Sequence, residues 1–438
     1  MKTNKITVLG GGLAGCECAY QLAKRGYDVD LYEMRPNKQT AVHKTGDLAE
    51  LVCSNSLKST DVNTAQGLLK YELKRLDCMI LRVAETCSVP AGGALAVDRK
   101  LFSEGVEKEL KRFPNITVKR EEATSINSDG YTVVATGPLT EGELANEIAR
   151  ITGMDSLRFY DAVAPIVSAE SVDMEKAFFA GRYGKGGDDY LNCPMDKEEY
   201  LAFWQEIVNA ETVILKEFEK KDVFNACMPI EIMAKRGEDA MRFGPLRPVG
   251  LRDPKTGVRP YAVVQLRKED NYNGFYNLVG FQTNLKFGEQ KRVFGMIPAL
   301  KNAEFVRYGV MHRNTFLNAP ETLNADFSLK GNENVFFGGQ ISGVEGYLES
   351  TMSGLFCAIA IDRAIRGKEK IIPPETTACG SLMKYVSSPN KDFQPMHVGY
   401  ALMPELSERI KDKKKRKEEY SRRAIAAIEQ FAEKIEKE

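Results

Sequence analysis

The feature that most constrains this chain is a glycine-rich turn between an apolar strand and a helix, close to the first residue. Residues 5–33 read KITVLGGGLAGCECAYQLAKRGYDVDLYE, in which Gly10, Gly12 and Gly15 have the G-x-G-x-x-G spacing. In this motif the glycines allow a tight turn, the approach of a pyrophosphate and close helix–strand packing, while the helix N-terminus faces the phosphates. A second strand ends at Glu33, where a carboxylate can accept a hydrogen bond from a ribose hydroxyl. The stretch predicts a dinucleotide-binding unit.

A second strand–glycine–helix pattern lies far along the chain. A strand is expected at 334–337, followed by Gly338-Gly339 and by a helix over 347–366 that is dense in small residues. A second helix N-terminus would then face the cofactor, although a simple turn is the alternative for the glycine pair. The residues that we expect to bind the cofactor are Gly10, Gly11, Gly12, Leu13, Ala14, Gly15, Glu33, Gly338 and Gly339.

Only one such fingerprint is present in the sequence. The other glycine cluster, at 181–190, has no strand before it and no helical pattern after it, so we interpret it as a loop. One firmly held dinucleotide suggests bound FAD, with NAD(P)H visiting transiently.

The order of the patterns predicts an α/β fold with an inserted domain. The apolar strand within 132–139 ends at a glycine, as strands of a doubly wound, mostly parallel sheet do where they face a ligand. From about 160 to 294, strand-like pieces alternate with loops rich in glycine, proline and arginine, which indicates α+β character. We expect a Rossmann-like FAD-binding domain in two parts (1–165 and 298–405), an inserted substrate or RNA domain (166–297) and a basic C-terminal helix (406–438).

Composition narrows the classes of function. The 438 residues contain no apolar run near the roughly 20 residues that span a bilayer, and we expect no signal peptide, so the chain is expected to be cytoplasmic. The nine cysteines form no C-x-x-C pair and the three histidines are far apart, which argues against a metal site. Sixty-one basic residues balance 61 acidic ones, so a nucleic acid would need a local basic patch, for which 411–423 is a candidate.

Two cysteines have unusual surroundings. Cys53 lies in LVCSNSLKS, among hydroxyl and amide side chains and near Lys58. Cys227 lies in FNACMPIEIM, directly before Met228-Pro229, and proline there favours the end of a strand or a turn. Most free cysteines are buried and inert, and neither of these has an adjacent histidine, so a protease-like pair is not expected. Both are nevertheless candidates for catalysis.

Taken together, these segments resemble the folate- and FAD-dependent tRNA (uracil-54-C5)-methyltransferases of bacteria. The resemblance covers essentially the whole chain, and the segments around the two cysteines are more specific than the glycine fingerprint. The segments that carry it include GGGLAGCE (10–17), ELVCSNSLKS (50–59), VPAGGALAVDR (89–99), YDAVAPIV (160–167), GKGGDDYLNCPM (184–195), CMPIE (227–231), RFGPLRPVGL (242–251) and FFGGQISGVEGYLEST (336–351).

The resemblance implies methylation of C5 of uridine 54 in the T-arm of tRNA. The family takes the one-carbon unit from 5,10-methylenetetrahydrofolate, uses reduced FAD as the hydride source and restores it with NAD(P)H. The cysteine that matches Cys227 adds as a thiolate to C6 of uracil. The cysteine that matches Cys53 assists, either by removing the C5 proton or by guarding a one-carbon flavin adduct.

Several features and alternatives stay open at this level. The arginines of 242–252, with Phe243, suit an RNA-contacting loop and are the nearest candidates to activate Cys227, while Arg182, Lys185 and Lys286 are candidates for a basic folate rim. The same chemistry on a ribosomal RNA uridine is one alternative. An NAD(P)H-dependent flavin oxidoreductase acting on a small molecule is another alternative, and it would not need Cys227. A flavin-bearing RNA-binding or assembly protein is a third, and it would tolerate the replacement of both cysteines.

Overall fold

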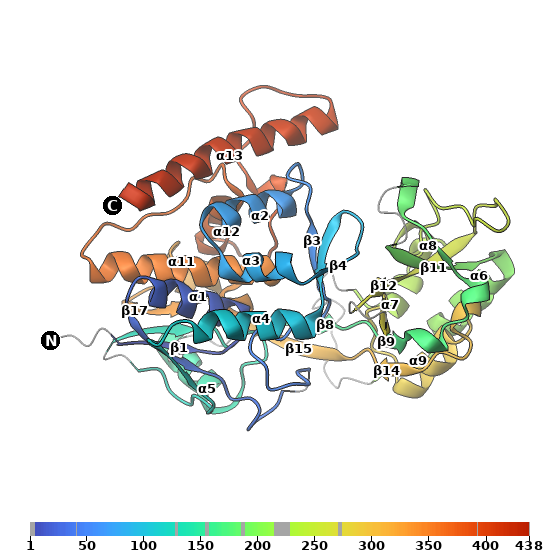
Figure 1. The fold of residues 1–438 in the computed structure, drawn as a ribbon, viewed down its shortest axis with the longest axis horizontal. Coiled ribbons are helices and arrows are strands. Elements are labelled where there is room, and N and C mark those ends of the chain that lie inside the picture. The colour runs from blue at the N-terminus through green and yellow to red at the C-terminus, as the bar shows by residue number, and fades with distance from the viewer. Residues whose placement is uncertain are drawn as a thin grey trace.

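The protein has two domains (Figure 1). Its computed structural model describes residues 5–40, 42–127, 130–153, 157–184, 189–213, 228–269, 274–391 and 393–437, with the backbone alone for 5, 157–162 and 311–313.

The first domain is built on a six-stranded sheet in which every pairing but one is parallel. The motif strand lies in the middle, so its carboxyl end opens at the centre of the sheet edge, where such folds bind ligands. The predicted doubly wound α/β fold is therefore confirmed. In sheet order the strands are β16 (Ser328–Leu329), β17 (Asn332–Phe337), β7 (Tyr131–Val134), β1 (Lys5–Leu9), β2 (Asp28–Tyr32) and β6 (Ile116–Lys119).

Two helices from opposite ends of the sequence pack tightly together in this domain. They are α1 (Leu13–Lys24) and α11 (Tyr347–Ile365), which lie next to each other in Figure 1. A Cβ atom on Gly354 would stand 2.1 Å from the Ala14 carbonyl oxygen, so the small residues of α11 are required for this approach. The other helices of the domain are α2 (Ala65–Arg75), α3 (Met79–Thr86), α4 (Arg99–Lys111), α5 (Gly142–Thr152), α10 (Ala319–Thr322) and α12 (Ala378–Ser387).

Buried carboxylates hold some of these helices in place. Glu17 of α1 accepts hydrogen bonds from the backbone N–H groups of Met79 and Ile80 at the start of α3. Glu72 of α2 does the same for Ala378 and Cys379 at the start of α12. A carboxylate at a helix N-terminus satisfies unpaired N–H groups and matches the positive end of the helix dipole.

The inserted domain has its own six-stranded antiparallel sheet and its own hydrophobic core. This sheet extends through residue 307, ten residues past the expected end of the insertion at 297, because β14 pairs with β9. Its strands in order are β10 (Phe178–Phe179), β11 (Tyr190–Met195), β12 (Ala262–Lys268), β13 (Phe275–Leu278), β9 (Ile166–Ser168) and β14 (Phe305–Arg307), covered by α6 (Lys197–Asn209), α7 (Ile230–Ala234), α8 (Ala240–Phe243) and α9 (Phe287–Phe294).

The chain passes between the domains on two paired strands. β8 (Leu157–Ala162) leads into the insertion and β15 (Met311–Phe316) leads back, and the two are antiparallel. A small three-stranded sheet of β3 (Ser56–Ser59), β5 (Ala94–Val97) and β4 (Ser88–Val89) lies on the insertion side of the first domain (Figure 1).

The C-terminal helix α13 (Lys413–Lys437) crosses the top of the first domain, above α2 and α12 (Figure 1). Glu429 accepts hydrogen bonds from the Tyr71 hydroxyl (2.8 Å) and from Arg75 Nε (2.6 Å) on α2. Phe431 contacts Phe356 of α11, with ring centroids 6.2 Å apart. The basic residues at its start are exposed, and RNA contact there stays a prediction.

We predict that Gly15→Ala destabilises the protein, because the new Cβ would stand 1.9 Å from the Gly10 carbonyl oxygen. The loss should exceed the roughly 1 kcal/mol that alanine gains over glycine inside a helix. Thermal unfolding should show a clearly lower midpoint for this variant. Gly93→Ala is the control, since no described atom lies within 4 Å of its Cβ position, and an equal loss in both variants would contradict the prediction.

Candidate active site

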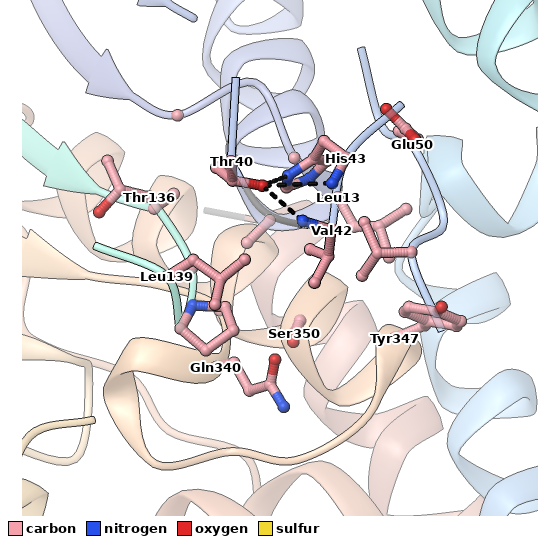
Figure 2. A pocket seen from close by; sticks show the side chains of 18 of the residues that line it. Leu13, Thr40, Val42, His43, Glu50, Thr136, Leu139, Gln340, Tyr347 and Ser350 are labelled. Carbon is pink, nitrogen blue, oxygen red and sulfur yellow. Dashed lines mark hydrogen bonds between the residues drawn. The ribbon is translucent and has the colours of Figure 1, made fainter. Parts of the chain in front are cut away.

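A cavity of about 420 Å³ lies at the carboxyl end of the parallel sheet. Figure 2 shows side chains from distant parts of the chain pointing into it, including Leu13, Thr40, Glu50, Gln340 and Tyr347. Its wall is formed by the β1–α1 turn, the end of β2, residues 50–58, the segment after β7 and the start of α11. Of the predicted site residues, the wall contains Gly10, Gly12, Leu13, Ala14, Glu33, Cys53 and Gly339.

The glycines of the turn have different physical reasons to be glycine. Gly10 has φ +102°, and a Cβ there would stand 2.4 Å from the Ala135 carbonyl oxygen. A Cβ on Gly11 would lie 2.5 Å from the Leu48 side chain, whereas a Cβ on Gly12 would project into space clear of described atoms within 4 Å. Since Gly12 also lines the cavity in front of the α1 N-terminus, the turn fits a bound pyrophosphate.

Glu33 is tied to the glycine turn and to Arg35. One of its oxygens accepts hydrogen bonds from the Gly11 N–H (3.0 Å) and Arg35 Nη2 (3.0 Å), and the other accepts from Arg35 Nε (2.9 Å). Burial raises the pKa of Glu33, but the hydrogen bonds and charge of Arg35 outweigh it, so the pKa lies below its usual value. The carboxylate is thus ionised and held in the cavity wall, while its contact with a ribose stays a prediction.

The second glycine pair lies between β17 and α11, in the strand–glycine–helix order that the sequence predicts. A short 3₁₀ turn, Gln340–Ser342, follows the pair, and α11 begins only at Tyr347. Gly339 has φ +80°, donates its N–H to Ser353 Oγ (2.6 Å) and lines the cavity, whereas Gly338 is outside the wall and packs near Cys357. The start of α11 nevertheless reaches the cavity through residues 346–350.

Cys53 lies in the wall of the same cavity as Gly12 and Gly339. It is half-buried. The hydroxyl oxygen of Tyr347, the first residue of α11, accepts hydrogen bonds from the backbone N–H groups of Cys53 (2.9 Å) and Ser54 (3.1 Å). The loop that carries this cysteine is therefore fixed against the helix that lines the cavity.

Three arginines hold the other side of the Cys53 loop. Arg99 Nη2 donates to the Cys53 carbonyl (3.2 Å), and Arg307 Nη2 donates to the carbonyl of Val52. Arg267, from β12, donates to Ser54 Oγ (2.7 Å) and to the Asn55 side chain (3.0 Å). We call Arg99, Arg267 and Arg307 the arginine clamp; the last two belong to the inserted domain.

The clamp makes the surroundings of Cys53 electropositive. Burial lowers the pKa of Arg267 and of Arg307, and for Arg307 the charge of Arg99 adds to the effect, yet guanidinium groups stay charged in proteins. Glu269 pairs with Arg99 (2.6 Å), so among the described residues one carboxylate is paired with the three positive charges of the clamp. Such a field favours an anion, a thiolate included, at the Cys53 position.

Cys227 lies outside the described residues. On either side of 214–227, the chain is attached to one short stretch of the insertion. The Val213 N–H donates to the Asn284 carbonyl (2.9 Å), and the Ile230 N–H donates to the Gln282 carbonyl (2.7 Å). Gln282 is part of the cavity wall.

The basic residues suggested for other ligands have different surroundings. Arg182 donates to Gln265 (3.1 Å) and to the Val249 carbonyl (2.9 Å), and Lys286 pairs with Glu211. Neither belongs to the cavity wall, and Lys185 is outside the described residues. Phe243 is 73% exposed beside Arg242, whose guanidinium lies over the Tyr261 ring at 4.0 Å, and an RNA contact there stays a prediction.

Some wall residues were missed by the sequence analysis. His397 lines the cavity from the C-terminal part of the chain, and burial followed by the charge of Lys58 lowers its pKa. No local motif indicates His397 or Tyr347. Arg267 did leave a signal, since it is a charged residue at the end of the apolar run YAVVQLR.

Within the described ranges, no group of three or more histidine, cysteine or acidic side chains is arranged to hold a metal ion. None of the helices in that part of the chain combines the length and the apolar character needed to cross a lipid bilayer.

Fold and site define an α/β dinucleotide-binding protein with an inserted domain, and comparison with known proteins identifies its family. A family model described as "Glucose inhibited division protein A" matches residues 5–369. The chain is 56% identical, over 97% of its length and 98% of the relative's, to a Desulfitobacterium hafniense protein named methylenetetrahydrofolate--tRNA-(uracil-5-)-methyltransferase TrmFO. It is 54% identical to a Lactobacillus johnsonii protein of the same name, over 98% of both chains. The chain belongs to the TrmFO family, which confirms the resemblance seen in the sequence.

A solved structure supports the fold. Aquifex aeolicus GidA superposes with a TM-score of 0.70 over 98% of this chain and 73% of that one. At 14% identity, this likeness concerns the fold alone.

We predict that Tyr347→Phe loosens the Cys53 loop, because two partly buried N–H groups lose their acceptor while the ring is kept. Each such loss costs about 1–3 kcal/mol. Hydrogen exchange should show faster exchange of the Cys53 and Ser54 amides, with a lower unfolding midpoint. Tyr183→Phe, at a 67% exposed tyrosine, serves as the control and should change neither; unchanged amide protection in Tyr347→Phe would contradict the hydrogen bonding described.

Proposed function

We propose that this protein methylates C5 of uridine 54 in the T-arm of tRNA, with 5,10-methylenetetrahydrofolate as the one-carbon donor. The relatives that match this chain over almost their whole length are named as this methyltransferase. The observation that carries the proposal is that Cys53 and the pyrophosphate-fitting Gly12 line one cavity. A thiol beside a dinucleotide site suits chemistry that needs both a sulfur nucleophile or base and a redox cofactor.

FAD is the cofactor in this proposal, and the chain offers residues for each of its parts. Gly12 and the first N–H groups of α1 would hold the pyrophosphate, and Glu33 would hold a ribose hydroxyl. Gly339 and the start of α11 would lie at the opposite end, where a positive helix dipole favours negative charge. Bound FAD, reduced by NAD(P)H, supplies the hydride that completes the methyl group.

The two cysteines divide the work on the uracil. C5 of uracil becomes nucleophilic only after a nucleophile adds to C6, and we assign that addition to the Cys227 thiolate. Support comes from the attachment of residues 213 and 230, on either side of its segment, next to Gln282 of the cavity wall. Cys53, in the field of the arginine clamp, would take the proton from C5 or guard the one-carbon unit.

The nucleic-acid partner in this proposal is tRNA, and the cell compartment is the cytoplasm. The uridine must leave its stacked loop to enter the cavity, at a cost of a few kcal/mol. We propose no membrane association and no metal for the reaction.

We predict that Cys227→Ala abolishes methyl transfer, because no sulfur remains to add to C6, while flavin stays bound. Tritium release from C5-labelled uridine in tRNA, with and without methylenetetrahydrofolate, measures the reaction, and absorbance near the visible flavin bands measures the cofactor. Cys53→Ala should strongly lower the rate. Cys193→Ala, in the core of the insertion, is the control and should keep its rate. Normal turnover by Cys227→Ala would make the nucleophile assignment wrong. Faster methylation of a ribosomal RNA transcript than of tRNA would identify ribosomal RNA as the substrate instead.

We predict that the purified protein is yellow and that Gly12→Val loses its flavin, because the side chain occupies the space meant for the pyrophosphate. The fold should survive, since the new Cβ has no described atom within 4 Å. Flavin absorbance per polypeptide and the thermal midpoint of the stripped proteins are the measurements. Gly93→Val, at an exposed glycine with equally open surroundings, should keep its flavin. A Gly12→Val protein with a full content of flavin would contradict the assignment of Gly12 to the pyrophosphate.

A further inference from the structure

Three aromatic rings of the inserted domain form a continuous stack that ends at the surface. The rings of Phe305 and Tyr308 are 5.4 Å apart and within 8° of parallel, and those of Tyr308 and Phe287 are 4.8 Å apart and within 17°. At the inner end, Phe305 contacts the buried Phe294. At the outer end, the Phe287 side chain is 53% exposed. We call Phe305, Tyr308 and Phe287 the aromatic stack.

The aromatic stack is linked to the cavity that holds Cys53 through residues that neighbour it in the sequence. Phe287 opens α9, shortly after the wall residue Gln282. Tyr308 directly follows Arg307 of the clamp, whose guanidinium donates to Val52 in the cavity wall. Figure 1 shows α9 beside β14, on the part of the insertion where β15 returns to the first domain. The aromatic stack is therefore carried by the same two segments of the insertion that supply Gln282 to the cavity wall and Arg307 to the clamp.

The surroundings of the outer ring leave room for a further planar group. Gly288 follows Phe287, and no described atom lies within 4 Å of the position of a Cβ on it. Lys291 is exposed on the same short segment, where it can meet a phosphate, whereas Lys286 pairs with Glu211. Aromatic rings beside lysines are the combination with which proteins hold unpaired nucleotides, because every base has a π face and every linkage a negative charge.

We propose that Phe287 is a stacking site for an unpaired base of the RNA substrate. The base adds a fourth ring to the aromatic stack. This inference rests on the proposed function, which makes RNA the substrate. When one base of a loop enters the cavity, its neighbours lose a stacking partner. The Phe287 ring replaces that partner, so the extruded conformation of the RNA is bound more tightly than the stacked one.

The test compares variants that keep or remove the ring. Phe287→Leu removes the π face and Phe287→Trp enlarges it, while Phe275→Leu alters a 43% exposed ring elsewhere in the insertion and serves as the control. The dissociation constant for an unmodified tRNA transcript, KM and kcat for tritium release, flavin content and the thermal midpoint are measured for each protein. We expect a rise in the dissociation constant of roughly 5- to 100-fold for Phe287→Leu, with KM rising and flavin content unchanged. For Phe287→Trp and Phe275→Leu, the dissociation constant for the transcript should stay within about twofold of the wild-type value. That change is much smaller than the one expected from the loss of one stacking partner.

A second readout does not depend on affinity. The natural chain contains a single tryptophan, so Phe287→Trp adds one new fluorophore. Its emission, relative to that of the wild-type protein, should be quenched when the transcript binds, whereas Phe275→Trp should show no added quenching. Equal binding by wild type and Phe287→Leu, together with an unquenched Phe287→Trp, overturns the stacking site. A wild-type protein that neither binds the transcript nor releases tritium overturns the proposed function itself.

Discussion

The close contact between α1 and α11 is the constraint on which the site depends. The Ala14 carbonyl and the Gly354 Cα approach so closely that a single added carbon would overlap the oxygen. Because of this contact, the N-termini of two helices from opposite ends of the sequence open onto one cavity. One end provides Gly12 and the other provides Gly339 and Tyr347, so the parts of the chain on both sides of the insertion must pack before the cavity exists.

The second constraint is the arginine clamp, which joins the two domains at the Cys53 loop. Two of its guanidinium groups come from the insertion and bond to atoms of residues 52–55 in the first domain. Buried charges of this kind are costly unless each is paired or hydrogen-bonded. Here the cost is balanced by Glu269 and by carbonyl acceptors, and the remaining positive charge is concentrated beside a thiol. The position of Cys53 is thus set by the insertion as much as by its own domain.

Local features could be predicted from the sequence, and contacts between distant residues could not. The glycine motif predicted the strand before it, the helix after it and the second strand that ends at Glu33, because each depends on neighbours within about thirty residues. The helix over 347–366 was found as well, since α11 spans Tyr347–Ile365. The interaction of Glu33 with Arg35 could not be predicted from the sequence. The end of the insertion could not be predicted either, because it depends on the pairing of β14 with β9 at the edge of the sheet. Arg99, Arg267, Arg307 and His397 meet the cavity region only through the fold, so no local pattern could have grouped them.

The order of residues along β14 gives the insertion a way to connect RNA binding with the Cys53 loop. Arg307 reaches the Val52 carbonyl, and Tyr308, the next residue, is the middle ring of the aromatic stack. Because Tyr308 is bonded to Arg307, a displacement of the Tyr308 ring by a group on the outer ring would also reach the backbone that carries Arg307. Packed interiors transmit small displacements because they contain little free volume. The contact proposed for the RNA and the arginine that bonds the Cys53 loop therefore lie on one segment of the inserted domain.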